Sequence, residues 1–142
     1  MRLPTVLCAG DLPEQELISA TLDGELQRVG GAYCPVDTIV NTVQRAASVA
    51  AEAPGWAIAE QHTAAWIYGA TTDLMRPLQL CVDSRTRLHP ISTRLHAFRE
   101  VVVGDRDLRL IGRMPVTTPL RTAIDIARFT AVISDSDRDI IR

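Results

Sequence analysis

The strongest constraint on the fold is an amphipathic pattern that runs from residue 38 to residue 52. Its apolar side chains recur at intervals of three and four, and they are Ile39, Val43, Ala46, Ala47 and Ala50. This spacing gathers them on one face of a helix, and Pro54-Gly55 ends that helix. Because a helix with one apolar face must bury it against another element, the rest of the chain has to supply that surface.

Several short segments with the residue pattern of β-strands can supply the surface on which this helix packs. Leu78, Leu80 and Val82 alternate with Gln79, Cys81 and Asp83, which is the period of a half-buried strand. Further short strands are expected at residues 56–59, 95–99, 108–111 and 114–116, with a loop from 84 to 94 and a polar turn at Gly104-Asp105. Helices and strands in this irregular order indicate an α+β fold.

The front of the chain predicts a helix and then a β-hairpin. Asp11, Pro13 and Glu14 form a capping-box-like helix start, and Gly24 ends the helix. Its apolar residues Leu17, Ile18 and Leu22 share one face. Two extended runs, 25–29 and 32–36, flank Gly30-Gly31 and predict the hairpin. Residues 4–9 fit either a short helix or a strand.

Three more helices are expected. The first spans residues 60–68 and ends at Gly69. The second begins at Thr117-Thr118-Pro119, where a hydroxyl can cap the helix and proline fits its first turn. Its apolar stripe consists of Leu120, Ala123, Ile124 and Ala127. The last helix is capped by Ser134 or Asp135.

All 15 basic residues are arginine, and this excludes several chemistries. A phosphate-loop lysine, a Schiff-base lysine and the lysine of a nuclease site all need an ammonium group that guanidinium cannot imitate. Three widely spaced cysteines give neither a disulfide framework nor a zinc site, and no apolar run reaches membrane-spanning length. We therefore expect a cytoplasmic protein with no cofactor, no metal and no membrane partner.

Charge is distributed unevenly along the chain. Residues 1–60 contain three arginines and eight acidic residues, whereas residues 61–113 contain eight arginines and five acidic residues. The candidate residues for binding DNA or a protein partner are Arg28, Arg76, Arg85, Arg87, Arg94 and Arg99. Guanidinium groups bind phosphate and carboxylate equally well, so a nucleic-acid backbone, an acidic protein and a merely solvated loop all stay open.

Other polar residues have simpler interpretations. His62, His89 and His96 lack the spacing of a metal site, and we expect His62 to cap or pack at a helix start. Arg121 and Asp125 lie four residues apart and predict an ion pair on one helix face. A cavity that gathered His62, Arg121 and Asp125 would favour a small enzyme instead.

Several motifs resemble the AbiEi family of bacterial antitoxin-like proteins. They are G-E-L-Q-R-V-G-G-A-Y at residues 24–33, H-T-A-A-W-I-Y-G at 62–69 and M-P-V-T-T-P-L-R-T-A-I-D-I-A-R at 114–128. The resemblance implies an abbreviated winged-helix-like unit, residues 1–36, with the hairpin as its wing, packed on a mixed α+β body, residues 37–142. It does not extend to the nuclease-like domain of some longer relatives.

The function that this resemblance implies is non-enzymatic. An antitoxin or transcriptional regulator of this kind binds its own operator DNA and opposes a nucleotidyltransferase-like toxin, so DNA and a toxin protein are the implied partners. The alternative is a protein-interaction module, or a remnant of a longer nuclease-associated protein, that does not bind DNA. Acidic residues in the first helix, Glu14 and Glu16 among them, favour the alternative because they repel phosphates.

Overall fold

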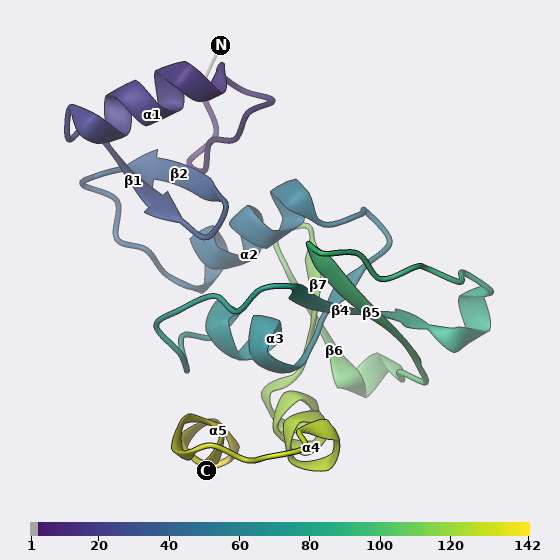
Figure 1. Ribbon diagram of the computed structural model, residues 1–142. Coiled ribbons are helices and arrows are strands. Elements are labelled where there is room, and N and C mark those ends of the chain that lie inside the picture. The colour runs from purple at the N-terminus through teal and green to yellow at the C-terminus, as the bar shows by residue number, and fades with distance from the viewer. Residues whose placement is uncertain (1–2) are drawn as a thin grey trace.

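The computed structural model describes residues 3–142, which form a mixed α+β fold (Figure 1). Its helices are α1 (Glu14–Leu22), α2 (Thr42–Glu52), α3 (Gln61–Ile67), α4 (Pro119–Phe129) and α5 (Asp135–Ile141). Strands β1 (Leu26–Val29) and β2 (Ala32–Pro35) form a hairpin. The larger sheet contains β3 (Ile58–Ala59), β4 (Leu78–Asp83), β5 (His96–Val101), β6 (Leu108–Ile111) and β7 (Met114–Thr117). The expected α+β class is confirmed.

The larger sheet mixes parallel and antiparallel pairs. Its strand order is β5-β4-β3-β7-β6. The pairs β4 with β5 and β3 with β7 are parallel, and the other two are antiparallel. All five strands occur at or near the places that the alternating patterns predicted, and two short 3-10 turns, Ser84–Thr86 and Asp105–Asp107, lie between them.

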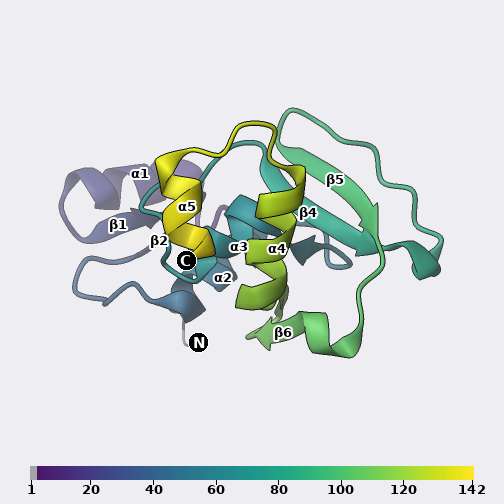
Figure 2. The same ribbon diagram turned by 90° about the horizontal axis from the view of Figure 1, so that it is seen from below.

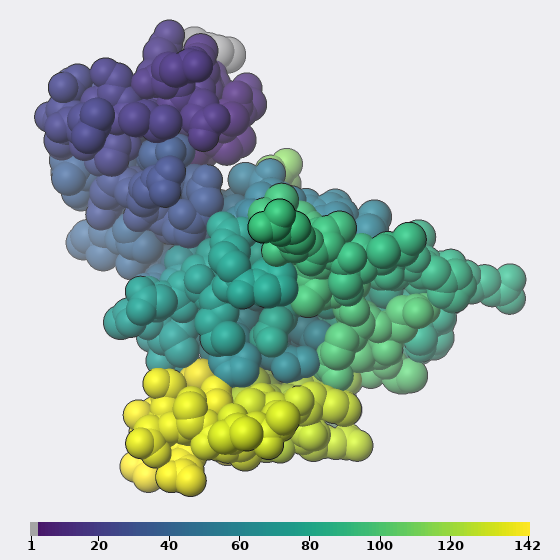
Figure 3. All heavy atoms as spheres, in the orientation of Figure 1, coloured from purple at the N-terminus to yellow at the C-terminus, as the bar shows by residue number. Residues whose placement is uncertain are grey.

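The two ends of the chain form separate layers of the molecule. The N-terminal residues make a lobe at one end, and α4 and α5 cover the opposite end (Figures 1 and 3). Seen from below, α4 and α5 lie side by side beneath α3 (Figure 2). Helices α2 and α3 and the larger sheet lie between these two ends (Figure 1).

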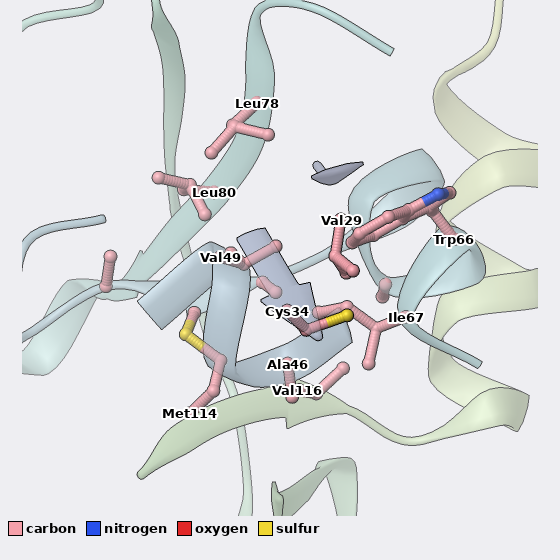
Figure 4. Packing of buried hydrophobic residues seen from close by; sticks show 13 residues of the cluster. Val29, Cys34, Ala46, Val49, Trp66, Ile67, Leu78, Leu80, Met114 and Val116 are labelled. Atoms are coloured by element: carbon pink, nitrogen blue, oxygen red, sulfur yellow. The ribbon is translucent and has the colours of Figure 1, made fainter. Parts of the chain in front are cut away.

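The main core lies between α2, α3, the hairpin and the sheet. Ala46 and Val49 of α2 pack with Val116 of β7, Leu80 of β4 and Ile67 of α3 (Figure 4). Of the five residues predicted on the apolar face, Ala46 is buried and Ala50 is half-buried, whereas Ile39, Val43 and Ala47 are exposed. The predicted face is therefore wrong at three positions, and the helix buries Ser48 and Val49 beside Ala46 instead. The helix begins later than expected, at Thr42, because Asn41 and Gln44 form a capping box there, so Ile39 lies before it and is 84% exposed.

A smaller core holds the N-terminal lobe together. Leu7, Leu17 and Tyr33 pack with Leu12 and Leu26. Backbone hydrogen bonds of 2.7 and 2.9 Å pair Leu7 with Tyr33, so this part of residues 4–9 is extended and the helical alternative is wrong.

Helix α1 differs from its prediction both in how it is capped and in which side chains it buries. The Asp11 carboxylate accepts from the backbone N–H of Cys8 at 2.9 Å and does not cap the helix, which starts after Pro13. Of the three apolar residues expected on one buried face, Leu17 is buried whereas Ile18 and Leu22 are exposed. The lobe is too small to cover more than one side chain of this helix.

The hairpin turn is packed against the body. Gly30 has φ +57°, and a Cβ there would lie 3.0 Å from Ser48 Oγ and 3.2 Å from the Trp66 ring. A Cβ at Gly31 would lie 2.9 Å from the Glu52 carboxylate. Val29 and Cys34 of the hairpin also belong to the main core. The predicted boundary after residue 36 therefore falls between parts that share a core, and the division into two units stays a prediction.

Helix α4 starts as predicted but turns a different face inward. Thr118 caps it and Pro119 follows. Leu120 is 72% exposed and Ile124 is 42% exposed, so the expected apolar stripe is wrong. The buried residues are Thr122, Asp125 and Ile126, because Thr122 bonds to Thr117 and Asp125 pairs with arginines. Polar partners set the orientation of this helix.

Two further predictions concern the C-terminus and the cysteines. Ser134 caps α5 in a capping box with Asp137, as one of the two alternatives expected. Cys34 and Cys81 are buried and Cys8 is half-buried, and all three thiols are free. Burial raises the pKa of both buried thiols. Among residues 3–142, no helix has the length and apolar composition needed to cross a membrane.

Candidate functional site

The six candidate arginines lie at three separate places. Arg85, Arg87 and Arg94 belong to one exposed loop, residues 84–95, which we call the basic loop. Arg28 and Arg76 line a pocket beside the hairpin. Arg99 belongs to a network of charged side chains under α4. The structure thus places Arg85, Arg87 and Arg94 together in one loop and Arg28 and Arg76 together in one pocket, and it places Arg99 apart from both.

The basic loop projects from the end of β4, at the side of the molecule opposite the N-terminal lobe (Figures 1 and 3). Its first arginine is held in place: Arg85 donates to both Asp83 carboxylate oxygens and to the carbonyl oxygen of Val103 at 2.6 Å. Hydrogen bonds from Arg85 lower the pKa of the Asp83 carboxyl. The base of the loop is therefore rigid.

The other two arginines of the loop are available for a partner. Within residues 3–142, neither Arg87 nor Arg94 forms an ion pair, and both are exposed. His89 contacts Glu100 at 2.8 Å, and Ser92 accepts from the backbone N–H of Phe98 at 2.9 Å, so the loop is anchored on β5. Ile91 is 84% exposed beside them. The loop presents two unpaired guanidinium groups and an apolar side chain on a fixed support.

Arg99 forms ion pairs with acidic residues inside the protein. Its Nε and Nη2 atoms each donate to the Glu60 carboxylate at 2.7 Å, and Glu60 is 1% exposed. Asp125 lies 3.7 Å away and is shared with Arg121, which also reaches Asp107 at 3.1 Å. Acidic and basic groups alternate through this network. It confirms the predicted Arg121–Asp125 pair and ties β3, β5 and α4 together.

Two further observations place the network at a constrained junction. Gln61, the first residue of α3, has φ +46°, a backbone conformation that non-glycine residues rarely adopt. The guanidinium of Arg99 also lies 4.3 Å from the centre of the Phe129 ring. Hydrogen bonding to Glu60 raises the pKa of Arg99. This arginine therefore stays charged, and its donors face the protein.

His62 lies in a separate environment. Its Nε2 contacts Asp137 at 2.5 Å and its Nδ1 contacts Gln79 at 3.0 Å. His62 and Asp137 line a cavity of about 580 Å³ that includes neither Arg121 nor Asp125. The grouping of His62, Arg121 and Asp125 that would favour an enzyme is therefore not found in this cavity.

Sequence reasoning missed Glu60 and Arg45. Glu60 lies between a buried strand and a buried helix, and a lone carboxylate in such a run needs a cationic partner. Arg45 lies on α2 beside the buried Ala46, and it donates to the backbone oxygens of Trp66 and Thr71. An unpaired charge within a predicted core segment was the available signal for both.

The arrangement described above defines a mixed α+β protein with an N-terminal helix–hairpin lobe and an exposed basic loop. No family model matches the chain, and no curated protein matches it. The likeness to AbiEi proteins therefore rests on the sequence motifs alone.

Proposed function

We propose that the chain is a non-enzymatic regulator of the AbiEi antitoxin type, with a winged-helix-like front and a DNA contact on its body. In this role it binds its own operator and opposes a nucleotidyltransferase-like toxin. The order helix, hairpin and mixed α+β body supports the proposal. The single observation that carries it is the basic loop, where Arg87 and Arg94 stand unpaired among the described residues.

The loop suits a phosphate backbone better than the front of the chain does. Guanidinium groups bind phosphate oxygens through paired N–H donors. Helix α1 carries Glu14 and Glu16 in its first turn, and these carboxylates repel phosphates. The hairpin turn is packed on Ser48 and Trp66 and has no room to enter a groove. We therefore assign the DNA contact to residues 84–95.

Fluorescence anisotropy tests the proposal. The chain is titrated against its own upstream DNA and against a scrambled duplex, each at two salt concentrations. We expect tighter binding to its own DNA and a steep loss of affinity with salt. The double variant Arg87→Gln/Arg94→Gln should reduce the slope of log affinity against log salt by about 2.

A charge-matched control separates the loop from general electrostatics. Arg106 and Arg113 are exposed outside the loop, so Arg106→Gln/Arg113→Gln removes the same charge elsewhere. Equal weakening by the two double variants, or no binding at low salt, would refute DNA binding by the loop.

A second candidate function is a protein-interaction module without DNA binding. The observation that favours it is the outward face of α4, where Leu120 and Ile124 are exposed on a helix that buries polar residues. If a toxin is encoded beside the chain's own gene, substituting both residues by serine should weaken binding to that purified toxin and leave folding unchanged. Unaltered affinity would count against this face.

A further inference from the structure

Three arginines from distant parts of the chain line one pocket, which we call the arginine pocket. Arg28 comes from β1, Arg45 from α2 and Arg76 from the segment before β4. The pocket lies between the hairpin and the body and has a volume of about 470 Å³. Sites for small molecules fall in this size range.

Each of the three arginines is anchored from one side. Arg45 Nη1 donates to the carbonyl oxygens of Trp66 at 2.6 Å and Thr71 at 3.1 Å. Arg76 donates through both terminal nitrogens to Glu52, at 2.6 and 2.9 Å. Arg28 Nη2 donates to the Tyr33 hydroxyl at 3.1 Å. A guanidinium has five N–H donors, so each group keeps donors for a ligand while its position is fixed.

The pocket carries an excess of positive charge. Asp73 belongs to its lining, and Glu52 beside it pairs with Arg76, so three guanidinium groups meet two carboxylates and one positive charge remains in excess. Gathering like charges in a partly enclosed space costs free energy. An anion bound among the three arginines would relieve that repulsion.

We propose that the arginine pocket binds a phosphorylated small molecule. A phosphate group carries up to two negative charges and three acceptor oxygens, which suits three guanidinium groups better than a single carboxylate does. Val29, Val40 and Leu74 also line the pocket and offer apolar contacts to the organic part of the ligand. This site is separate from the basic loop, so it stands or falls independently of the DNA contact.

Tryptophan fluorescence provides a direct readout. The chain has two tryptophans: Trp66 lines the pocket, and Trp56 packs against Phe98 at 5.3 Å between ring centres. In a Trp56→Phe background, Trp66 is the sole indole. We expect saturable changes with ribose 5-phosphate, weaker binding of inorganic phosphate and no response to ribose. A short DNA duplex should not compete.

Two variants test the role of the arginines. Arg28→Gln should raise the dissociation constant for ribose 5-phosphate about 10- to 100-fold, whereas Arg113→Gln, which is exposed and outside the pocket, should leave it unchanged. Circular dichroism checks that both variants fold. If Arg28→Gln does not fold, the indole N–H signal of Trp66 in the unmodified chain should still move on ligand addition while that of Trp56 stays in place.

Several results would overturn the proposal. One is the absence of saturable binding of either phosphate up to about 10 mM. Another is equal affinity for inorganic phosphate and ribose 5-phosphate, which would show that the pocket does not recognise the organic part of the ligand. Displacement of ribose 5-phosphate by the duplex would reassign the pocket to the DNA backbone, and equal weakening by Arg113→Gln would show that only net charge matters.

Discussion

His62 Nε2 and Asp137 Oδ1 lie 2.5 Å apart and join α3 to the last helix across 75 positions of the sequence. On the other side of the ring, Nδ1 faces Gln79 Oε1, which also accepts the backbone N–H of His62 at 2.8 Å. Both ring nitrogens therefore lie against side-chain oxygen atoms. Asp137 is further held by Ser134, whose hydroxyl donates to it at 2.8 Å. This set of contacts fixes α5 on the body.

Removing the Asp137 charge should loosen that attachment. Asp137 is 5% exposed, and breaking a buried pair leaves its partner uncompensated. We expect Asp137→Asn to lower the free energy of unfolding by about 3 kcal/mol, measured by urea denaturation. The exposed neighbour Asp139 provides the control, and Asp139→Asn should change stability by less than about 0.5 kcal/mol. Similar losses in the two variants would contradict the role of the pair.

The same contacts predict an acid-sensitive step. Burial opposes ionisation of Asp137, but hydrogen bonds from His62 and Ser134 outweigh it and hold the pKa of its carboxyl below the ordinary value of 3.8. Between those two pKa values the unfolded chain binds more protons than the native one, so this stabilising contribution is present above the ordinary pKa and is lost as pH falls through the lower one.

Thermal unfolding from about pH 5 to about pH 2 measures this contribution. The wild-type chain should lose stability more steeply than Asp137→Asn in that window, because the variant has no carboxyl to protonate. Parallel curves for the two chains would refute the assignment.

Glu60 predicts a second large effect. Arg99 forms two bonds of 2.7 Å with its carboxylate, and the carboxylate is almost fully buried. Glu60→Gln removes the charge that these donors require and should cost about 2–3 kcal/mol of unfolding free energy. Glu25→Gln, at an exposed position just before β1, is the matched control and should be nearly neutral.

The hairpin turn offers a test of backbone conformation. Gly30 has φ +57° and its missing Cβ would lie 3.0 to 3.2 Å from neighbouring side chains. Gly30→Ala should therefore destabilise the chain by about 1–2 kcal/mol or more. Gly55→Ala places its methyl group in open space and should have little effect. Equal midpoints in a thermal melt would show that the turn tolerates a side chain.

The sequence predicted elements better than the faces they bury. Strand β4 was predicted from its alternation, and Leu78, Leu80 and Val82 are buried as that pattern requires. Helix α2 was predicted as an element, but it buries Val49 and leaves the predicted Val43 exposed. The same argument failed for helix α4, since Asp125 is buried against Arg99 of β5, which is distant in sequence, and Thr122 is buried against Thr117 of β7. The basic loop was visible as a cluster of arginines, whereas the arginine pocket depends on three segments that only the tertiary fold brings together.

The burial of Cys34 and Cys81 leaves Cys8 as the one thiol of the chain that solvent reaches. Their thiols stay protonated at neutral pH because burial raises the pKa of both, and a protonated thiol is a poor nucleophile. Cys8 is half-buried and lies in the N-terminal lobe. A maleimide dye or spin label would therefore attach at a single natural position, on the part of the molecule farthest from α5 (Figure 3).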